Sequence, residues 1–330
     1  MKTAAVVFKS AGKAAVEEID MPPPGKHQVQ VRSICSTISA GTEGWGFQDK
    51  FTWAKTPFPC VPGYERVGIV EAIGDDVQGI QVGQRVAATT GVWEGPVKPF
   101  WGSHIALANT WAGEIYALPE GVDDINASAM IVAEVGYNAA YRATMQAGDW
   151  VVVYGDGIIG QCAAQAARSR GAKVILVGHR KERLDLGAKH SADFAVNAKS
   201  EDVVERVRAI IGGKHVPVLL DTVQTEASQK QYIDLLEYAK GQIVYSGFTP
   251  GNAWADMALL QQRELTTHFI AGWTRPRNEA TLRLMAIGKM DVRPLITHTV
   301  KGSQGNKMYD MILNKSEAFM GINLNWQEIR

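Results

Sequence analysis

The first third of the chain is a series of short β-prone runs separated by turns. Residues 29–34 alternate apolar and polar side chains with a period of two, and residues 67–73 form a β-rich run. A similar run follows at residues 82–87, after another turn. Prolines at positions 22–24 interrupt the pattern, because proline removes a hydrogen-bond donor from a sheet. This pattern predicts an irregular antiparallel β domain.

The pattern changes in the second part of the chain. Residues 127–146 are rich in alanine and helical in character, and residues 150–154 form the continuous apolar run of a buried parallel strand. Helical stretches then alternate with further apolar runs, at residues 173–177, 216–221 and 242–246. Strands that alternate with helices indicate βαβ units, so the sequence predicts an α/β protein with a doubly wound parallel sheet.

Length and charge narrow the classes of function. With 330 residues the chain is long enough for two domains, and 46% hydrophobic with 21% charged residues is typical of a globular protein. Lys plus Arg and Asp plus Glu number 34 each, so no overall field attracts nucleic acid or an anionic membrane. We therefore expect a small-molecule substrate, with no nucleic-acid or membrane partner.

Two further features concern the compartment. Residues 1–8 lack the longer apolar segment of a signal peptide, and no stretch reaches the ~18 apolar residues that span a bilayer. The cysteines Cys35, Cys60 and Cys162 are odd in number and widely spaced, which favours a reducing compartment over a disulfide framework. A cytoplasmic protein is expected.

A glycine motif directly follows the predicted strand at residues 150–154 and opens a predicted helix. It matches the dinucleotide-binding pattern G-x-G-x-x-G, in which the first glycine makes a tight turn, the second lets the backbone approach a pyrophosphate, and the third permits close helix–strand packing. The alternative is a glycine-rich turn without a ligand, and the strand–turn–helix context favours the nucleotide. The expected cofactor contacts here are Gly155, Asp156, Gly157, Ile158, Ile159 and Gly160.

The end of the next predicted strand indicates which nucleotide is bound. An NAD site usually has Asp or Glu there, about 20 residues after the glycines, to bind the ribose 2′-hydroxyl. This chain has Gly178 instead, followed by a basic cluster of His179, Arg180, Lys181 and Arg183. Glycine leaves room for a 2′-phosphate and guanidinium groups bind phosphate, so NADP(H) is favoured. The alternative is a solvated, charged start of a helix.

On these motifs the chain resembles the medium-chain dehydrogenase/reductase superfamily over nearly its full length. The resemblance also rests on residues 32–37, 61–68, 82–86 and 293–298. It implies a GroES-like catalytic domain of irregular β structure, formed by residues 1–121 and 274–330, and an inserted Rossmann dinucleotide-binding domain at residues 122–273. It also implies a homodimer or homotetramer, and residues 266–270 are a candidate for the contact.

Zinc-dependent members of this superfamily bind catalytic zinc through a Cys, a His and a third Cys, Asp or Glu. Cys35 matches the first ligand and Glu134 the third, but Tyr64 stands at the His position, and a neutral phenol is a poor zinc ligand. Glu65 matches a family glutamate close to the metal, so a site of Cys35, Glu65 and Glu134 is the alternative. Three unclustered cysteines cannot form the family's four-cysteine structural site. We expect no zinc.

Within the superfamily, residues 38–43, 61–65 and 323–326 are similar to the group that contains bacteriochlorophyllide a dehydrogenase. The pigment substrate is not implied for this chain, since the loops that would shape a pocket differ. The basic cluster after Gly178 also departs from an NAD-using relative.

Hydride transfer to a carbonyl leaves charge on oxygen, which a metal-free site must stabilise with its own donors. Tyr64 is the expected hydrogen-bond donor or acid, Thr37 matches a family hydroxyl that relays protons, and Glu65 and Glu134 would set the proton balance. The alternative for Tyr64 is a buried anchor of the backbone. Cys35 is expected to be a small core residue rather than a nucleophile.

Family position also suggests the residues around the nicotinamide and the substrate. The nicotinamide would be lined by Ser246, Gly247, Phe248, Ala271 and Gly272, and Thr222 would lie near the cofactor at the end of the fourth strand. Several loops are unusually aromatic, which favours a roomy pocket for a ring-bearing or sugar-like substrate, and a subunit interface or loop core is the alternative. The expected pocket residues are Cys35, Ser39, Trp45, Phe47, Trp93, Trp101 and Trp273.

The sequence thus predicts a zinc-independent, NADP(H)-dependent oxidoreductase acting on a ketone or secondary alcohol. A zinc-free, NADPH-dependent reductase of enones or quinones is an alternative in the same fold, and Tyr64 would matter little there. A non-catalytic NADPH-binding sensor is an alternative from another class.

Overall fold

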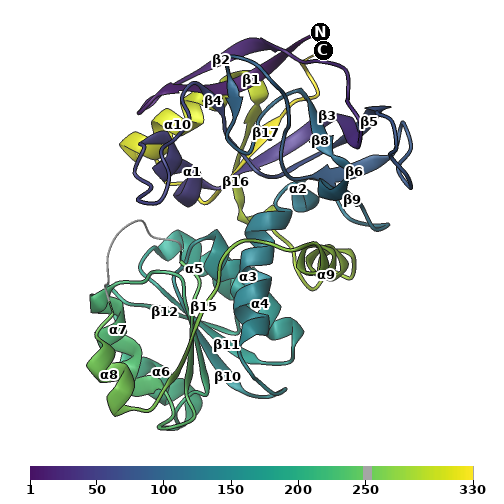
Figure 1. The fold of residues 1–330 in the computed structure, drawn as a ribbon. Coiled ribbons are helices and arrows are strands. Elements are labelled where there is room, and N and C mark those ends of the chain that lie inside the picture. The colour runs from purple at the N-terminus through teal and green to yellow at the C-terminus, as the bar shows by residue number, and fades with distance from the viewer. Residues whose placement is uncertain (248–254, 330) are drawn as a thin grey trace. The chain divides into compact units, whose positions relative to one another are not determined.

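The computed structural model describes residues 1–247 and 255–329, which form two compact units (Figure 1). Unit 1 consists of Met1–Ile131 and Leu295–Arg330, and unit 2 of Val132–Pro294. The sequence suggested 1–121 with 274–330 for one domain and 122–273 for the other. The division differs because α2 (Asp124–Ala127) packs on strands of unit 1, whereas α9 (Arg275–Ala286) belongs with unit 2.

Unit 1 is built on two sheets that are mostly antiparallel. One has the strand order β2-β1-β4-β7, and the other the order β16-β17-β3-β5-β6-β9, with β8 also paired to β3. The strands are β1 (Lys2–Ser10), β2 (Lys13–Asp20), β3 (Gln28–Ile38), β4 (Cys60–Val61), β5 (Arg66–Ile73), β6 (Arg85–Ala88), β7 (Lys98–Pro99), β8 (Leu107–Trp111), β9 (Ile115–Ala117), β16 (Ile296–Lys301) and β17 (Gly321–Asn325). The longer helices are α1 (Ala40–Phe47) and α10 (Gly305–Asn314).

Strand β3 is the centre of the larger sheet. It pairs antiparallel with β5, β8 and β17, and its register with β5 shifts twice. Such irregularities bend a strand and let it pair with different neighbours along its length. The irregular antiparallel β domain expected from residues 29–34 and 67–73 is confirmed.

Unit 2 contains one parallel sheet of six strands in the order β12-β11-β10-β13-β14-β15. These are β10 (Trp150–Tyr154), β11 (Lys173–Gly178), β12 (Phe194–Asn197), β13 (Val218–Asp221), β14 (Gln242–Tyr245) and β15 (Thr266–Phe269). Its helices besides α9 are α4 (Ile158–Ser169), α5 (Lys181–His190), α6 (Val203–Ile211), α7 (Glu226–Tyr232) and α8 (Met257–Gln262), and α3 (Met130–Arg142) enters it from unit 1. The predicted doubly wound sheet is confirmed.

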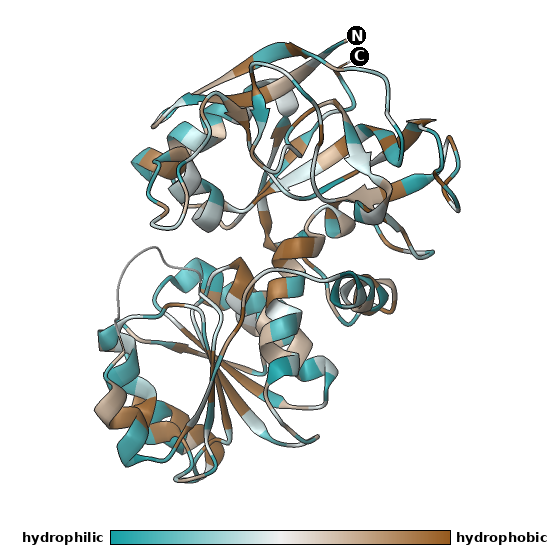
Figure 2. Ribbon diagram, viewed as in Figure 1, coloured by the Kyte–Doolittle hydropathy of each residue, from teal (hydrophilic) through white to brown (hydrophobic). Residues whose placement is uncertain are grey.

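Both faces of this sheet are covered. Helices α6, α7 and α8 lie on one side and α3 and α4 on the other (Figure 1). Because both faces are covered, the inner strands β10, β11, β13 and β14 are mostly apolar and buried, as Figure 2 shows for the centre of the sheet. On one face, alternate strand residues such as Val152 and Tyr154 pack against Val203 and Val207 of α6 and Tyr232 of α7.

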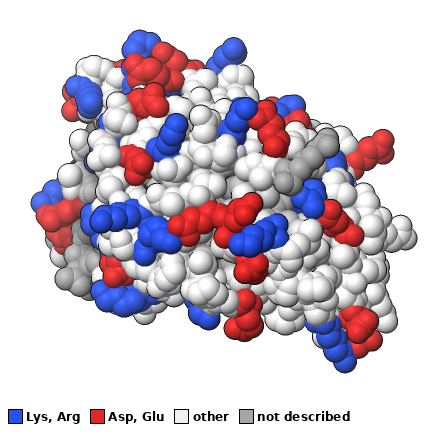
Figure 3. Space-filling model, turned by 90° about the horizontal axis from the view of Figure 1, so that it is seen from above, with Lys and Arg blue, Asp and Glu red and all other residues white. Residues whose placement is uncertain are grey.

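Charged side chains are distributed evenly over the surface that Figure 3 shows. Basic and acidic groups are interspersed there without an extended area of one sign, as equal numbers of both lead one to expect. Within the described residues no helix is both long and apolar enough to span a membrane.

Helices α3 and α4 approach each other so closely that a side chain would not fit at Gly136. A Cβ built on Gly136 would lie 2.5 Å from the backbone N of Ala163 and 2.6 Å from the Cβ of Cys162. The helix that carries the glycine motif is thus held against α3 by backbone packing.

Gly136→Ala should destabilise the protein by about 1–3 kcal/mol, because the added methyl group must push the two helices apart. The control is Gly41→Ala in α1, where a Cβ meets nothing within 4 Å. It should be neutral or stabilise by up to ~1 kcal/mol, since alanine favours a helix. Urea denaturation measures both, and equal effects of the two substitutions would contradict the packing argument.

Candidate functional site

The glycine motif forms the turn between β10 and α4, and two of its glycines are required sterically. Gly155 has φ +122°, and a Cβ there would lie 2.0 Å from Oγ1 of Thr222. A Cβ on Gly160 would lie 1.9 Å from the carbonyl oxygen of Gly155. The turn is therefore tight enough that only glycine fits at both positions.

Helix α4 offers its N-terminus to a ligand. Gly157 is its N-cap, and within the described chain no side chain caps the helix there. Its first N–H groups and the positive end of its dipole are therefore available to a phosphate. The motif also lies where the strand order reverses, between β10 and β13, which is where open α/β sheets bind ligands. These residues fit a dinucleotide.

The basic cluster lies beside this turn. Gly178 is the last residue of β11, Arg180 is the N-cap of α5, and Lys181 is its first residue. Nη1 of Arg180 lies 3.0 Å from Oδ1 of Asp156, and Nη1 of Arg183 lies 3.8 Å from the same oxygen. The sheet thus brings the strand-end cluster and the glycine motif together.

Charge and burial shift the pKa values in this cluster. Burial raises the pKa of Asp156, but hydrogen bonds from the N–H groups of Arg180 and His179 and the charges of Arg180 and Arg183 lower it more, so it lies below its usual range. Burial and then the Arg180 charge lower the pKa of His179. The carboxylate is therefore ionised and His179 is neutral at pH 7, which leaves Arg180, Lys181 and Arg183 as the cations of the cluster.

The other expected cofactor residues follow neighbouring strands. Thr222 follows β13 and bonds the carbonyl oxygen of Tyr154 through Oγ1, at 3.0 Å. Ser246 and Gly247 follow β14, and Ala271 and Gly272 follow β15. All lie at the carboxyl edge of one parallel sheet, together with Ile158 and Ile159 in the first turn of α4. Phe248 lies outside the described residues.

In unit 1, Tyr64 is buried and its ring stands edge-on to that of Trp101, with centroids 5.2 Å apart. Burial raises the pKa of Tyr64 far above its usual value, the charges of Glu43 and Glu65 raise it further, and the hydroxyls of Ser39 and Thr42 act in the opposite direction. The phenol therefore stays protonated and can act only as a hydrogen-bond donor or acceptor at neutral pH.

A fully buried polar network that the sequence did not indicate lies behind Tyr64. Nε2 of His104 lies 2.8 Å from Oε2 of Glu43, and its Nδ1 lies 2.8 Å from Oγ of Ser36. Tyr309 donates to the same carboxylate oxygen of Glu43, and the other oxygen accepts from the N–H of Ser39 at 2.8 Å. A carboxylate and an imidazole in contact are thus placed under the turn that carries Tyr64. An acidic residue in a glycine-rich helix was the only sequence signal for this network.

Thr37 belongs to a second buried cluster. Its Oγ1 lies 2.9 Å from Oγ of Ser128, and Nδ2 of Asn323 donates to both hydroxyl oxygens, at 3.2 and 2.9 Å. Cys35 is also buried, its Sγ lies 3.5 Å from the carbonyl oxygen of Asp124, and burial raises the pKa of its thiol to about 12. Such a thiol is not a ready nucleophile.

Glu134 is fully buried in unit 2, and Arg277 of α9 binds it. The Arg277 Nε donates to Oε1 of Glu134, and Nη2 donates to the carbonyl oxygen of Gly272 at 2.8 Å. Burial raises the pKa of Glu134 to about 7, against the opposing charge and hydrogen bond of Arg277. No sequence pattern indicated this pair, because its two residues are 143 positions apart.

The zinc-binding alternative can be tested on these donors. Oε2 of Glu65 accepts the N–H of Ile131 at 2.7 Å, and a guanidinium group binds Glu134. Over residues 1–247 and 255–329, no three His, Cys, Asp or Glu side chains form a group that could hold a metal ion. Two of the three donors of the alternative zinc site, Glu65 and Glu134, thus already bind protein groups.

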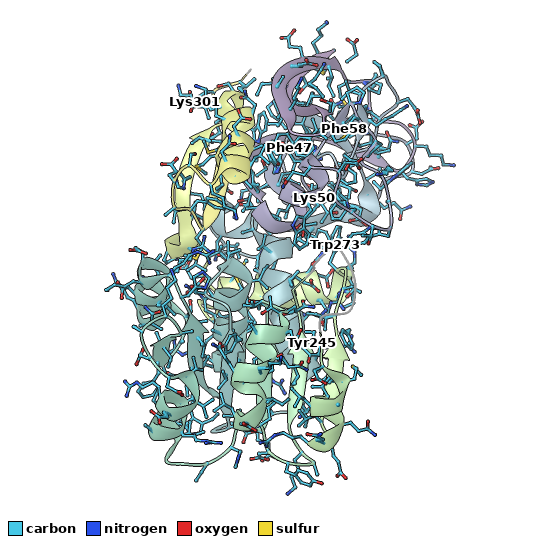
Figure 4. The ribbon with its side chains drawn as sticks, turned by 90° about the vertical axis from the view of Figure 1, so that its left-hand side faces the viewer. Phe47, Lys50, Phe58, Tyr245, Trp273 and Lys301 are labelled. Atoms are coloured by element: carbon cyan, nitrogen blue, oxygen red, sulfur yellow. The ribbon has the colours of Figure 1, made fainter. Side chains whose placement is uncertain are left out.

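The expected aromatic pocket residues have different surroundings. Phe47 packs against Phe8 and Tyr309 in the core of unit 1, and Trp93 is also in a hydrophobic cluster. Figure 4 labels Phe47 in the interior of unit 1. These two residues agree with the alternative of a loop core. Half-buried side chains are found at Trp45, Trp101 and Trp273, and Ser39 is buried before α1.

Two family patterns match the chain in order. Residues 25–99 match the alcohol dehydrogenase GroES-like domain, and residues 159–286 match the zinc-binding dehydrogenase family. The first match falls in unit 1 and the second in unit 2, so each compact unit corresponds to one domain.

Individual proteins show the same arrangement. A sorbitol dehydrogenase from Halalkalibacterium halodurans is 28% identical over 334 residues, covering 94% of this chain and 96% of that protein. A protein from Sinorhizobium meliloti, named as a zinc-binding dehydrogenase and bound to NADP, has a TM-score of 0.86 at 21% identity, covering 98% and 99% of the two chains. A short chain alcohol dehydrogenase from Escherichia coli complexed with NADH has a TM-score of 0.84 at 20% identity, with the same coverage. With both domains matched in order, the chain is similar to the medium-chain dehydrogenase/reductase superfamily of oxidoreductases, whose two-domain fold it shares.

Proposed function

We propose that the protein is a zinc-independent, NADP(H)-dependent oxidoreductase that interconverts a ketone and a secondary alcohol. One observation carries the choice of cofactor. The strand end beside the N-terminus of α4 has Gly178 in place of an acid, and the guanidinium groups of Arg180 and Arg183 lie next to it. Glycine leaves space for a 2′-phosphate, and arginine binds phosphate with charge-assisted hydrogen bonds.

The nicotinamide supplies or accepts the hydride when it is bound. The remaining requirement is a donor for the substrate oxygen, on which negative charge develops. Tyr64 has a hydroxyl that burial keeps protonated, so in this proposal it donates a hydrogen bond to that oxygen. Thr37, Glu65 and Glu134 are supporting residues, of which Thr37 lies in a hydroxyl cluster with Ser128.

The substrate class remains part of the proposal. Trp101 packs on Tyr64, so an aromatic ring is adjacent to the proposed donor. A ring of this kind suits a ring-bearing or sugar-like substrate, and the sorbitol dehydrogenase resemblance agrees with a polyol. None of the three cysteines is in a disulfide bond, which agrees with the proposed cytoplasmic location.

A zinc-free reductase of enones or quinones is the second candidate. The observation that favours it is the environment of Tyr64, whose high pKa makes the phenol a reluctant acid. In such a reduction the hydride adds to the β-carbon and a proton from water then adds to the α-carbon, so no proton donor is required beside the carbonyl carbon. Tyr64 would then serve only to anchor its turn.

Tyr64→Phe distinguishes the two candidates. For a carbonyl reductase, loss of the donor should lower kcat by about 10²–10⁴-fold, with the Kd for NADPH unchanged. Steady-state kinetics on a panel of ketones, secondary alcohols, enones and quinones measures this effect. The control is Tyr238→Phe, where the ring is 62% exposed and no change is expected. Full activity of Tyr64→Phe on enones or quinones would favour the second candidate.

We also propose that the protein is a homodimer or homotetramer through β15. This strand is at the edge of the parallel sheet, and Phe269 on it is 69% exposed. An unpaired strand edge with an apolar side chain is a template for pairing with a second copy. Light scattering should therefore give a dimer or tetramer that Phe269→Lys weakens, whereas Ile287→Lys, at an equally exposed position, should not. A monodisperse wild-type monomer would contradict the proposal.

A further inference from the structure

Asp156 is the residue between the first two glycines of the motif, and its side chain points into the protein rather than into solvent. Only 2% of the surface of Asp156 is exposed. Oδ2 accepts the N–H groups of His179 and Arg180, each at 2.8 Å, and Oδ1 faces Nη1 of Arg180 at 3.0 Å. The carboxylate thus comes from the glycine turn but binds the residues that follow the end of β11.

This placement explains why position 178 has no side chain. A Cβ built on Gly178 would lie 2.4 Å from the Cβ of Asp156 and 2.6 Å from its Oδ2. Real Cβ atoms do not approach that closely, and both neighbouring atoms belong to a side chain fixed by two N–H groups. An Asp or Glu at 178, which is where dinucleotide folds present an acid to the ribose 2′-hydroxyl, is excluded as long as Asp156 is present.

The carboxylate of Asp156 also orients two neighbouring guanidinium groups. Arg180 and Arg183 both face Oδ1 of Asp156, so one buried negative charge orients two guanidinium groups at the strand end. The net charge of these three groups remains positive, because two cations meet one anion. This net positive charge would therefore still attract the 2′-phosphate of NADP(H). A carboxylate at position 178, by contrast, would be repelled by the carboxylate of Asp156 in addition to colliding with it.

We propose that Asp156 is a specificity-determining residue of the nucleotide site: by occupying the space beside position 178 it excludes a strand-end acid and so favours NADP(H) over NAD(H). This inference rests on the proposed function, since it assumes that a nicotinamide dinucleotide binds at the glycine motif. The competing explanation is that Asp156 only holds the turn after β11, while the arginines alone set the preference.

A double-mutant cycle between positions 156 and 178 separates these explanations. Gly178→Asp alone should lower affinity for both NADPH and NADH by at least ~10-fold, because the new side chain collides with Asp156. Asp156→Gly removes the obstructing Cβ, so Gly178→Asp in that background should bind NADH at least ~10-fold more tightly than NADPH. Both Kd values are measured by cofactor fluorescence, which needs no substrate.

Gly178→Ala replaces Gly178→Asp in this test if the aspartate variant does not fold. Its single methyl group should reduce the affinity for both cofactors when Asp156 is present and have little effect beside Asp156→Gly. The matched control is Gly113→Asp, where a Cβ meets nothing within 4 Å and both affinities should stay unchanged. Thermal unfolding of each variant shows whether the fold is kept.

The inference is overturned if Gly178→Asp alone prefers NADH as strongly as the double variant, or if Gly178→Ala binds both cofactors as the wild type does. Either result leaves the proposed function standing, because the wild type still binds NADPH. Failure of the wild type to bind either nucleotide would instead overturn the proposed function itself.

Discussion

The nucleotide-binding unit depends on the close approach of three backbone segments at the end of β10. There is no space for a side chain on Gly155, which faces Thr222, or on Gly160, which faces the carbonyl oxygen of Gly155. Gly136 in turn allows α3 to pack directly on α4. These contacts fix the N-terminus of α4 at the point where the strand order reverses. The available N–H groups and dipole of the helix then create a phosphate site from the backbone alone. Everything proposed for the cofactor requires this turn.

Side chains around this phosphate site are proposed to determine which nucleotide binds and how the substrate oxygen is stabilised. At the strand end, Asp156 and its two arginines replace the usual acid. In the proposed mechanism Tyr64 takes the place of a zinc-binding histidine, and Arg277 binds the carboxylate of Glu134. In this proposal a cation lies where an NAD-selective site has an acid, and a neutral donor lies where a zinc-dependent site has a metal. Stabilisation of substrate oxygen would therefore come from a hydroxyl instead of a Lewis acid.

Local patterns made most of the fold predictable. The apolar run at 150–154 became β10 with the same bounds, and the glycine motif opened α4, because strand length, turn chemistry and burial are all local in sequence. Features that depend on distant residues were not predictable. The pairs Glu43–His104 and Glu134–Arg277 join residues 61 and 143 positions apart, and no periodicity marks them. Aromatic loops likewise did not indicate that Phe47 and Trp93 are in the core while Trp45 and Trp101 are half-buried.

The central claim is that the site binds NADP(H) and works without zinc. The most direct test is a paired titration of metal-analysed, purified protein with NADPH and with NADH, following cofactor fluorescence. We expect an affinity for NADPH at least ~10-fold above that for NADH, as one phosphate bound by arginine would give, and much less than one zinc per chain. Preference for NADH together with one tightly bound zinc per chain would contradict it.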